Sequence, residues 1–196
     1  ALNQSRKALT EKGKEEAIRI IETTELKNDR VLVVYLPDCH ESLAGIIAGR
    51  IREKYHRPAF VLTGGETSAK GSGRSIESYS MYEELVKCAD LMIQFGGHPM
   101  AAGLSIEEKN IEEFRRRLNV NCTLTDEELR PKIVIDVPMP VSYITKELVE
   151  QISLLEPFGK GNTKPVFAQK NLRVLDHSII GKNKNVCLLY TSDAAD

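Results

Sequence analysis

The chain lacks long apolar runs, paired cysteines and a strong net charge. Its four cysteines are scattered over 196 residues, with no C-x-x-C pair. This spacing argues against a disulfide framework or a zinc finger and fits a reducing cytosol, so we expect a cytoplasmic protein. The longest apolar runs, such as residues 31–36, are far shorter than the ~20 residues that a transmembrane helix needs.

What is present is the composition of a soluble globular chain. Hydrophobic residues make up 41% and charged residues 28%, which is enough to bury a core. The length allows one large domain or two small ones. The sequence opens at Ala1, inside a segment with helical spacing and without an initiator methionine or a signal-peptide pattern. We therefore expect a piece of a longer protein.

The net charge of −1 excludes a polycation, but the charge is distributed unevenly. Residues 156–185 hold six basic and two acidic residues, whereas residues 105–130 hold five basic and seven acidic residues. A local basic patch can bind a polyanion while the rest of a domain stays near neutral. A solvated lysine-rich surface is the alternative, and composition leaves both open.

The first part of the chain predicts an α/β sheet. Residues 1–29 have helical spacing, and residues 31–36 form an apolar, β-branched run typical of a strand buried on both faces. Residues 41–55 predict a helix with Ile46 on its apolar face, and residues 59–63 predict a second buried strand. This succession predicts a βαβ unit with parallel strands.

The pattern continues with further helices and shorter strands. Residues 79–88 predict a helix with Val86 inward, and residues 101–106 predict a strand. Beyond a polar stretch, residues 145–155 predict a helix with Leu155 inward. The β-like runs that follow are residues 165–168, 172–175 and 186–190. Short strands separated by turns fit a small barrel.

Two glycine-rich segments carry the side chains best suited to a phosphate. Gly71-Ser72-Gly73-Arg74-Ser75 and Gly96-Gly97-His98-Pro99 are both predicted to be turns, which let a backbone approach a ligand closely. Backbone N–H groups in such turns form anion-binding nests, and Arg74 adds a planar fork of donors. The Ser75 hydroxyl and the His98 ring can donate as well. The alternatives are an Arg74 paired with a surface carboxylate and a structural His98.

A second polar group follows the first predicted strand. Asp38, His40 and Glu41 could be read as metal ligands, because two carboxylates and an imidazole lie within four residues. No second cluster completes a two-metal site, which makes the metal reading the weaker one. Arg50 and Lys70 are candidates for contacts to a phosphate backbone.

These segments resemble a known family. GSGRS, a helix and then FGGHPMAAGLSI resemble the DHHA1 domain of the DHH phosphoesterase superfamily. The flanking segments HESLAGIIAGRIREKYHRPAFVLTGG and LEPFGKGNTKPVFAQKNLRV are similar to the RecJ family of single-strand-specific 5′→3′ DNA exonucleases. The resemblance covers roughly residues 1–189. Gly-Gly-His alone is a weak signal, whereas the ordered set of segments is specific.

The resemblance implies an α/β fold in which a DHHA1-like sheet with flanking helices precedes a partial OB-like β-barrel domain. An OB fold binds single strands through stacking and charge. Residues 191–196 match nothing in the resemblance and are predicted to be a tail foreign to the fold. The expected parts are a connecting helix (1–29), a DHHA1 domain (30–122), a linker with a partial OB-fold domain (123–190) and that tail.

The resemblance also implies a role in DNA repair and recombination, as the substrate-binding part of a 5′→3′ single-stranded-DNA exonuclease. Enzymes of this superfamily bind two Mn²⁺ or Mg²⁺ ions through an Asp-His-His motif and further aspartates. This sequence has no Asp-His-His. We therefore expect no metal, no catalytic residue and no hydrolysis in this chain alone. Single-stranded DNA is the expected partner, together with a single-strand-binding protein.

The contacts to the substrate are predicted from the resemblance together with the chemistry and local charge of the residues. The predicted phosphate-binding residues are Arg74, Ser75, Gly96, Gly97 and His98. The predicted contacts along the groove are His40, Glu41, Arg50, Lys70, Lys160 and Lys164.

Three other interpretations of the function are to be weighed against this one. The chain could be the DHHA1 part of an oligonucleotide or cyclic-dinucleotide phosphodiesterase, although such enzymes would not need the region after Pro131. It could be a non-enzymatic single-strand-binding module, although few aromatic residues follow Ser153. A nucleotide-binding α/β domain is disfavoured, because Ile76 stands where a dinucleotide fingerprint needs its third glycine.

Overall fold

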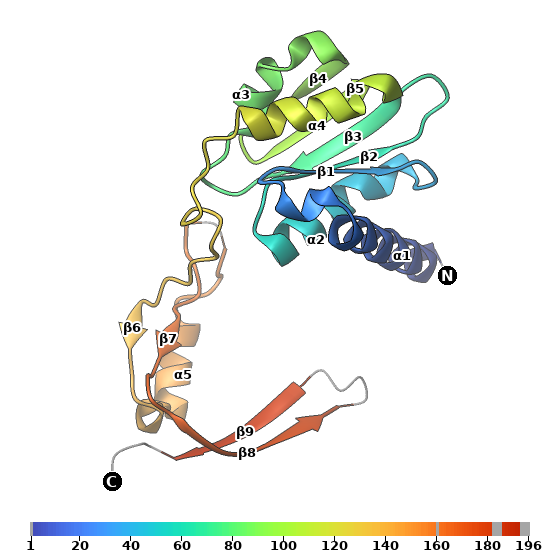
Figure 1. Ribbon diagram of the computed structural model, residues 1–196. Coiled ribbons are helices and arrows are strands. Elements are labelled where there is room, and N and C mark those ends of the chain that lie inside the picture. The colour runs from blue at the N-terminus through green and yellow to red at the C-terminus, as the bar shows by residue number, and fades with distance from the viewer. Residues whose placement is uncertain (1, 160, 182–185, 193–196) are drawn as a thin grey trace. The chain divides into compact units, whose positions relative to one another are not determined.

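The computed structural model describes residues 2–159, 161–181 and 186–192 (Figure 1). The chain divides into two compact units, which we call unit 1 (residues 1–131) and unit 2 (residues 132–196).

Unit 1 is built on a five-stranded sheet with the order β1-β2-β3-β5-β4. The strands are β1 (Leu32–Leu36), β2 (Ala59–Thr63), β3 (Ala69–Arg74), β4 (Met92–His98) and β5 (Ala101–Ile106). β1 and β2 are parallel and are joined by α2 (Glu41–Tyr55), whereas every other neighbouring pair is antiparallel. The predicted βαβ unit with parallel strands is confirmed.

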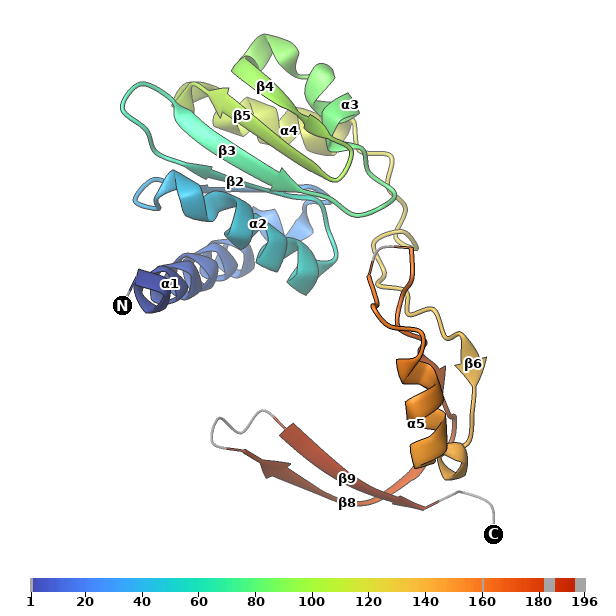
Figure 2. The same cartoon turned by 180° about the vertical axis from the view of Figure 1, so that it is seen from behind.

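Helices pack on both faces of this sheet. The other helices of unit 1 are α1 (Leu2–Thr23), α3 (Met81–Val86), α4 (Ile111–Val120) and short 3₁₀ helices at Glu25–Asn28, Ala89–Leu91 and Glu108–Asn110. α1 and α2 lie on one face and α3 and α4 on the other (Figures 1 and 2). Val33 and Phe60 pack towards α3 and α4, and Val34 and Val61 towards α1 and α2, so β1 and β2 are buried on both faces.

Several elements begin and end where the sequence predicts, namely α2, β2 and β5. The first helix is shorter than predicted, because Thr24 ends it and accepts a hydrogen bond from the N–H of Leu26. The inward positions predicted for Ile46 and Val86 are wrong, since these side chains are 41% and 50% exposed. Ile46 stands one residue before the buried Ile47, and Val86 one residue after the buried Leu85, which is 100° of helix rotation in each case.

The segment predicted as the first glycine turn is a strand. Gly71-Ser72-Gly73-Arg74 lies inside β3, paired with β2 on one side and β5 on the other. A Cβ at Gly73 would lie 2.6 Å from both Phe60 Cε1 and Met81 Sδ. This glycine leaves room for large core side chains, which is a usual reason for glycine within a strand. The backbone here is engaged in the sheet, so the predicted anion-binding nest is wrong.

The second predicted turn also lies mostly in a strand. Gly96-Gly97-His98 ends β4, and the connection to β5 is the dipeptide Pro99-Met100. Gly97 has a φ of 152°, and a Cβ there would lie 2.5 Å from Ala102 Cα. Gly97 is therefore required by the backbone of the hairpin.

Unit 2 consists of short elements with open pairing. They are β6 (Val137–Pro138), a 3₁₀ helix (Val141–Tyr143), α5 (Lys146–Ser153), β7 (Phe167–Ala168), β8 (Arg173–Ile180) and β9 (Val186–Ser192). β6 pairs with β7 in parallel, and β8 pairs with β9 antiparallel. None of the described side chains of unit 2 is buried, and Leu155, predicted inward, is 54% exposed. Short open strand pairs agree with the partial OB-like barrel that the sequence predicts.

The tail predicted at residues 191–196 overlaps β9, which continues to Ser192. Residues 193–196 lie outside the described residues. The foreign origin of this tail stays a prediction.

Replacing Gly73 with alanine is expected to destabilise the chain by about 1–3 kcal/mol, because the new methyl group overpacks against Phe60 and Met81. Gly96 is the matched control, because a Cβ there meets nothing within 4 Å. Gly96→Ala should change the free energy of unfolding by less than about 0.5 kcal/mol. Urea denaturation of the two variants and the parent chain measures the difference. Equal stability of the two variants would contradict the assigned register of β3.

Candidate nucleic-acid interface

The strand register places a row of polar and small residues on one face of the sheet. Val61 faces α2 and pairs with Ser72, so every second residue outward from Ser72 faces the same way. We call this set the polar floor. It comprises Lys70, Ser72 and Arg74 on β3, Ala101, Gly103 and Ser105 on β5, and Gln94, Gly96 and His98 on β4.

The polar floor is open over its outer strands. α2 lies over β2 and reaches β3, whereas β5 and β4 have no described helix of unit 1 above them on this face (Figure 2). Gln94, Gly96, His98 and Gly103 are exposed. A Cβ at Gly96 would meet nothing within 4 Å, and one at Gly103 only the Gly71 carbonyl at 3.7 Å. Packing within unit 1 therefore does not require glycine at either position. Because neither residue has a side chain, the backbone of the sheet is accessible there.

Arg74 is the best-placed cation of the polar floor. Its half-buried guanidinium donates from Nη1 to the Gly73 carbonyl oxygen at 2.7 Å and to Ser72 Oγ at 3.2 Å. Both acceptors are neutral. Other cations of unit 1, such as Lys70, pair with a carboxylate, but Arg74 forms no ion pair among the described residues. A partly desolvated charge without a counter-charge favours an anionic ligand.

Ser72 and His98 complete the donors near Arg74. Because Ser72 Oγ accepts from Arg74, its own proton is free to donate. His98 is exposed at the end of β4 and lies in register with Ala101 and Arg74. Two strand spacings separate His98 and Arg74, or about 10 Å between backbones. A phosphodiester backbone that lies over β5 could be bound by Arg74 from the β3 side and by His98 from the β4 side.

Lys70 lies at the other end of β3, beside the N-terminus of α2. Its Nζ is 2.7 Å from Glu41 Oε2, and both side chains are more than half exposed. This ion pair lowers the pKa of Glu41. His40 caps α2, with Nδ1 accepting the N–H of Ser42 at 3.2 Å. These side chains line a hollow of about 570 Å³ together with the loop at residues 64–68.

Several predicted site residues do not lie on the polar floor. Ser75 is buried, and its Oγ donates to the Tyr79 carbonyl at 2.5 Å, so the predicted phosphate contact from this hydroxyl is wrong. Arg50 pairs with Glu53 and stands about 100° around α2 from Gly49, which faces Arg74. The structure therefore does not bring Arg50 together with Arg74.

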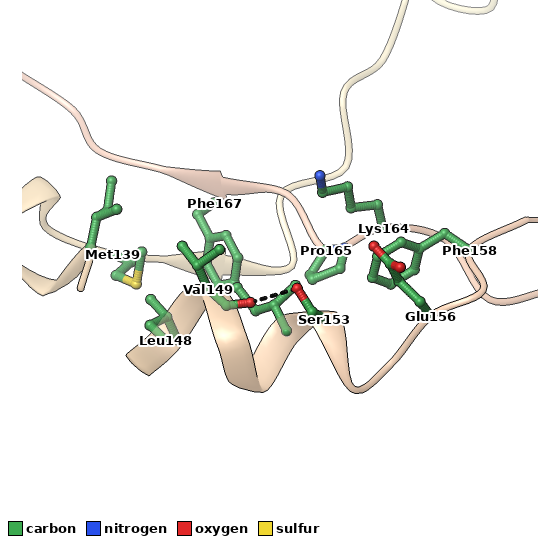
Figure 3. A pocket seen from close by; sticks show the side chains of 11 residues that line it. Met139, Leu148, Val149, Ser153, Glu156, Phe158, Lys164, Pro165 and Phe167 are labelled. Carbon is green, nitrogen blue, oxygen red and sulfur yellow. Dashed lines mark hydrogen bonds between the residues drawn. The ribbon is translucent and has the colours of Figure 1, made fainter. Parts of the chain in front are cut away.

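The two lysines predicted after Glu156 belong to unit 2. Lys160 lies outside the described residues. Lys164 lines an apolar hollow of about 230 Å³ between α5 and β7 (Figure 3). The hollow is walled by Leu148, Val149 and Phe167, with Lys164 and Glu156 supplying its charged groups. Lys164 is thus exposed on unit 2, and whether it contacts DNA stays a prediction.

The sequence reading missed Ser72, Gln94, Gly103 and Ser105 as members of this site. The signal that could have found them is alternation. Once residues 69–74 and 92–98 are read as strands, every second residue shares a face with Arg74 or His98. Reading the glycine segments as turns concealed that periodicity.

The side chains that the structure describes do not form a divalent metal site. Among the described residues no three His, Cys, Asp or Glu side chains converge as metal ligands. Glu41 is held by Lys70, and the Nδ1 atom of His40 is used in the cap of α2. The donors on the polar floor, by contrast, are of the kinds that suit an anion. None of the described helices combines the length and apolar character that crossing a membrane requires.

Comparison with known proteins defines the class of this chain. Residues 28–123 match the DHHA1 domain family, and residues 135–195 match the RecJ OB domain family. The chain is therefore a DHHA1-domain protein that continues into a RecJ-type OB domain.

Individual relatives narrow the class further. The RecJ single-stranded-DNA-specific exonuclease of Bacillus subtilis (strain 168) is 36% identical over 187 residues, which are 93% of this chain and 24% of that protein. The protein of the same name from Escherichia coli (strain K12) is 34% identical over 192 residues, 93% of this chain and 33% of that protein. The crystal structure of Thermus thermophilus RecJ in complex with Mg²⁺ superimposes with a TM-score of 0.72 at 25% identity, covering 100% of this chain and 31% of that one.

This chain belongs to the RecJ family. It spans between about a quarter and a third of the length of these relatives.

Replacing Lys70 with methionine is expected to raise the pKa of Glu41 towards its ordinary value of 4.5, because the hydrogen bond from Lys70 is the main cause that lowers it. With the folded pKa depressed, the stabilisation from the pair is present above pH 4.5 and is lost as the pH falls through the folded pKa. An NMR titration of the Glu41 carboxyl group measures the midpoint. Arg50→Met is the control and should leave it unchanged. An unchanged midpoint in Lys70→Met would contradict the pair.

Proposed function

We propose that the polar floor binds the phosphate backbone of single-stranded DNA for a 5′→3′ exonuclease of RecJ type. The observation that carries the proposal is the guanidinium of Arg74, which is half-buried, faces the floor and has only neutral hydrogen-bond partners among the residues that the structure describes. A phosphate offers the planar pair of oxygens that an arginine fork binds in bidentate fashion. Ser72 and His98 would add neighbouring donors.

The shape of the polar floor supports a single strand as the ligand. Gly96 and Gly103 remove side chains from its centre, so a sugar–phosphate backbone can approach the sheet closely. Lys70 and Arg74 stand four residues apart on β3, about 13 Å, which is the length of roughly four stacked nucleotides. The row could therefore contact several consecutive phosphates.

In this proposal the chain binds and orients the substrate and does not cleave it. RecJ of Thermus thermophilus has been crystallised with Mg²⁺ and with Mn²⁺. We propose that residues of the parent enzyme outside this chain hold such ions and hydrolyse the phosphodiester bond. By fixing the phosphates, Arg74 and His98 would decide which bond meets those residues. Association with a single-strand-binding protein and a cytoplasmic location stay predictions.

The second candidate function is binding of the single strand by unit 2. The match of residues 135–195 to the RecJ OB domain favours it as an additional surface, since OB folds bind single strands. The same match argues against a shorter oligonucleotide or cyclic-dinucleotide phosphodiesterase as the parent. The basic residues concerned are Lys164, Lys170 and Arg173, all described and exposed.

The Arg74→Ala, His98→Ala double variant is expected to bind a 5′-phosphorylated single-stranded oligonucleotide about 10- to 100-fold more weakly than the parent chain, because two phosphate contacts are lost. Fluorescence anisotropy across a salt series measures the affinity. The slope of log affinity against log salt should fall by about 1–2 in the variant, as expected for one or two fewer phosphate contacts.

The matched control is Arg50→Ala, which removes a guanidinium from the solvent side of α2 and should change affinity by less than about 2-fold. A Lys164→Ala, Lys170→Ala, Arg173→Ala variant tests unit 2. If it abolishes binding while the double variant binds normally, the polar floor is not the phosphate site.

The chain by itself is expected to release no nucleotides from single-stranded DNA in the presence of Mn²⁺ or Mg²⁺, because its described residues provide no metal site. Separation of a 5′-labelled oligonucleotide on a denaturing gel measures the cleavage. Metal-dependent cleavage that persists through purification, at a rate proportional to the concentration of the chain, would refute a purely binding role.

A further inference from the structure

Arg74 lies against a glycine face of α2. The glycines are Gly45 and Gly49, one helical turn apart and both partly buried. A Cβ at Gly45 would lie 2.9 Å from Arg74 Nη2 and 3.0 Å from Ser72 Oγ, whereas a Cβ at Gly49 would lie 4.0 Å from Arg74 Cγ. Gly45 thus faces the charged end of the arginine, and Gly49 faces its aliphatic stem at ordinary contact distance.

Neither glycine is explained by its backbone. Both lie within α2, and neither has a positive φ. Glycine within a helix is unfavourable compared with alanine, so its presence at this position calls for a steric reason. At Gly45 the atoms in the way are the end of Arg74 and the hydroxyl of Ser72, two donors of the polar floor.

We infer that Gly45 is a positioning residue, whose missing side chain lets the Arg74 guanidinium lie beside Ser72 in the orientation that binds phosphate. This inference rests on the proposed function of the polar floor. An arginine side chain has several rotatable bonds, and holding it in one orientation before the ligand arrives reduces the entropy lost on binding. The Gly73 carbonyl and Ser72 Oγ hold Nη1, and α2 limits the position of Nη2.

The test compares Gly45→Ala with Gly49→Ala in the full chain. The atoms displaced by the Gly45→Ala methyl group are ends of side chains, so the urea midpoint should stay equal or rise through the gain in helix propensity. The affinity for a 5′-phosphorylated single-stranded oligonucleotide of roughly 12 nucleotides should fall about 3- to 10-fold. Gly49→Ala should gain the same helix propensity. Its affinity for the oligonucleotide should stay within about 2-fold of that of the parent chain, since the new methyl group makes only ordinary contact with Arg74.

A double-mutant cycle with Arg74→Ala at low salt shows whether the loss of affinity in Gly45→Ala depends on the Arg74 side chain. In the Arg74→Ala background, Gly45→Ala should weaken binding by less than about 1.5-fold, because the side chain that it displaces is absent. An undiminished effect there would overturn the inference, as would normal affinity of Gly45→Ala alone. Normal affinity of Arg74→Ala would instead refute the proposed function.

Discussion

The register of β3 between β2 and β5 is the constraint on which the rest of unit 1 depends. A shift by one residue would turn Ser72 and Arg74 into the core and Gly71 and Gly73 towards α2. That arrangement would bury a guanidinium among apolar side chains, at a cost of several kcal/mol. The alternation of glycine with polar residues therefore specifies both the buried face and the open face of the same strand.

The two faces use small residues for different reasons. On the core side, Gly73 makes room for Phe60, which in turn packs edge-to-face on Phe114 with ring centroids 5.4 Å apart. On the opposite side, a Cβ at Gly96 would meet nothing within 4 Å and one at Gly103 would make only an ordinary contact, so no described neighbour requires them to be small. Close packing explains the small residue on the core side, whereas the proposed approach of a ligand backbone would explain those on the open side. One composition, rich in glycine and serine, would thus serve both stability and the proposed binding.

A net charge of −1 is compatible with the proposed binding of a polyanion, because the charges of the chain are paired unevenly. All three arginines of α4 are paired locally, for example Arg116 and Arg117 with Glu113, whose pKa their hydrogen bonds lower to about 2. Arg74 is different, because its partners are a carbonyl and a hydroxyl oxygen. In the proposed function, the placement of unpaired charge, rather than the total charge, attracts phosphate to the polar floor.

The sequence by itself determined the α/β class, the bounds of α2, β2 and β5, the parallel βαβ unit and membership of the RecJ family, because these depend on local apolar periodicity and on short ordered motifs. It also singled out Arg74 and His98. Only the tertiary structure decided that both glycine segments are strands, that Ser75 is buried, and that Ser72 and Gly45 adjoin Arg74. The physical reason is that glycine permits turn and strand alike, so pairing with residues distant in sequence decides between them.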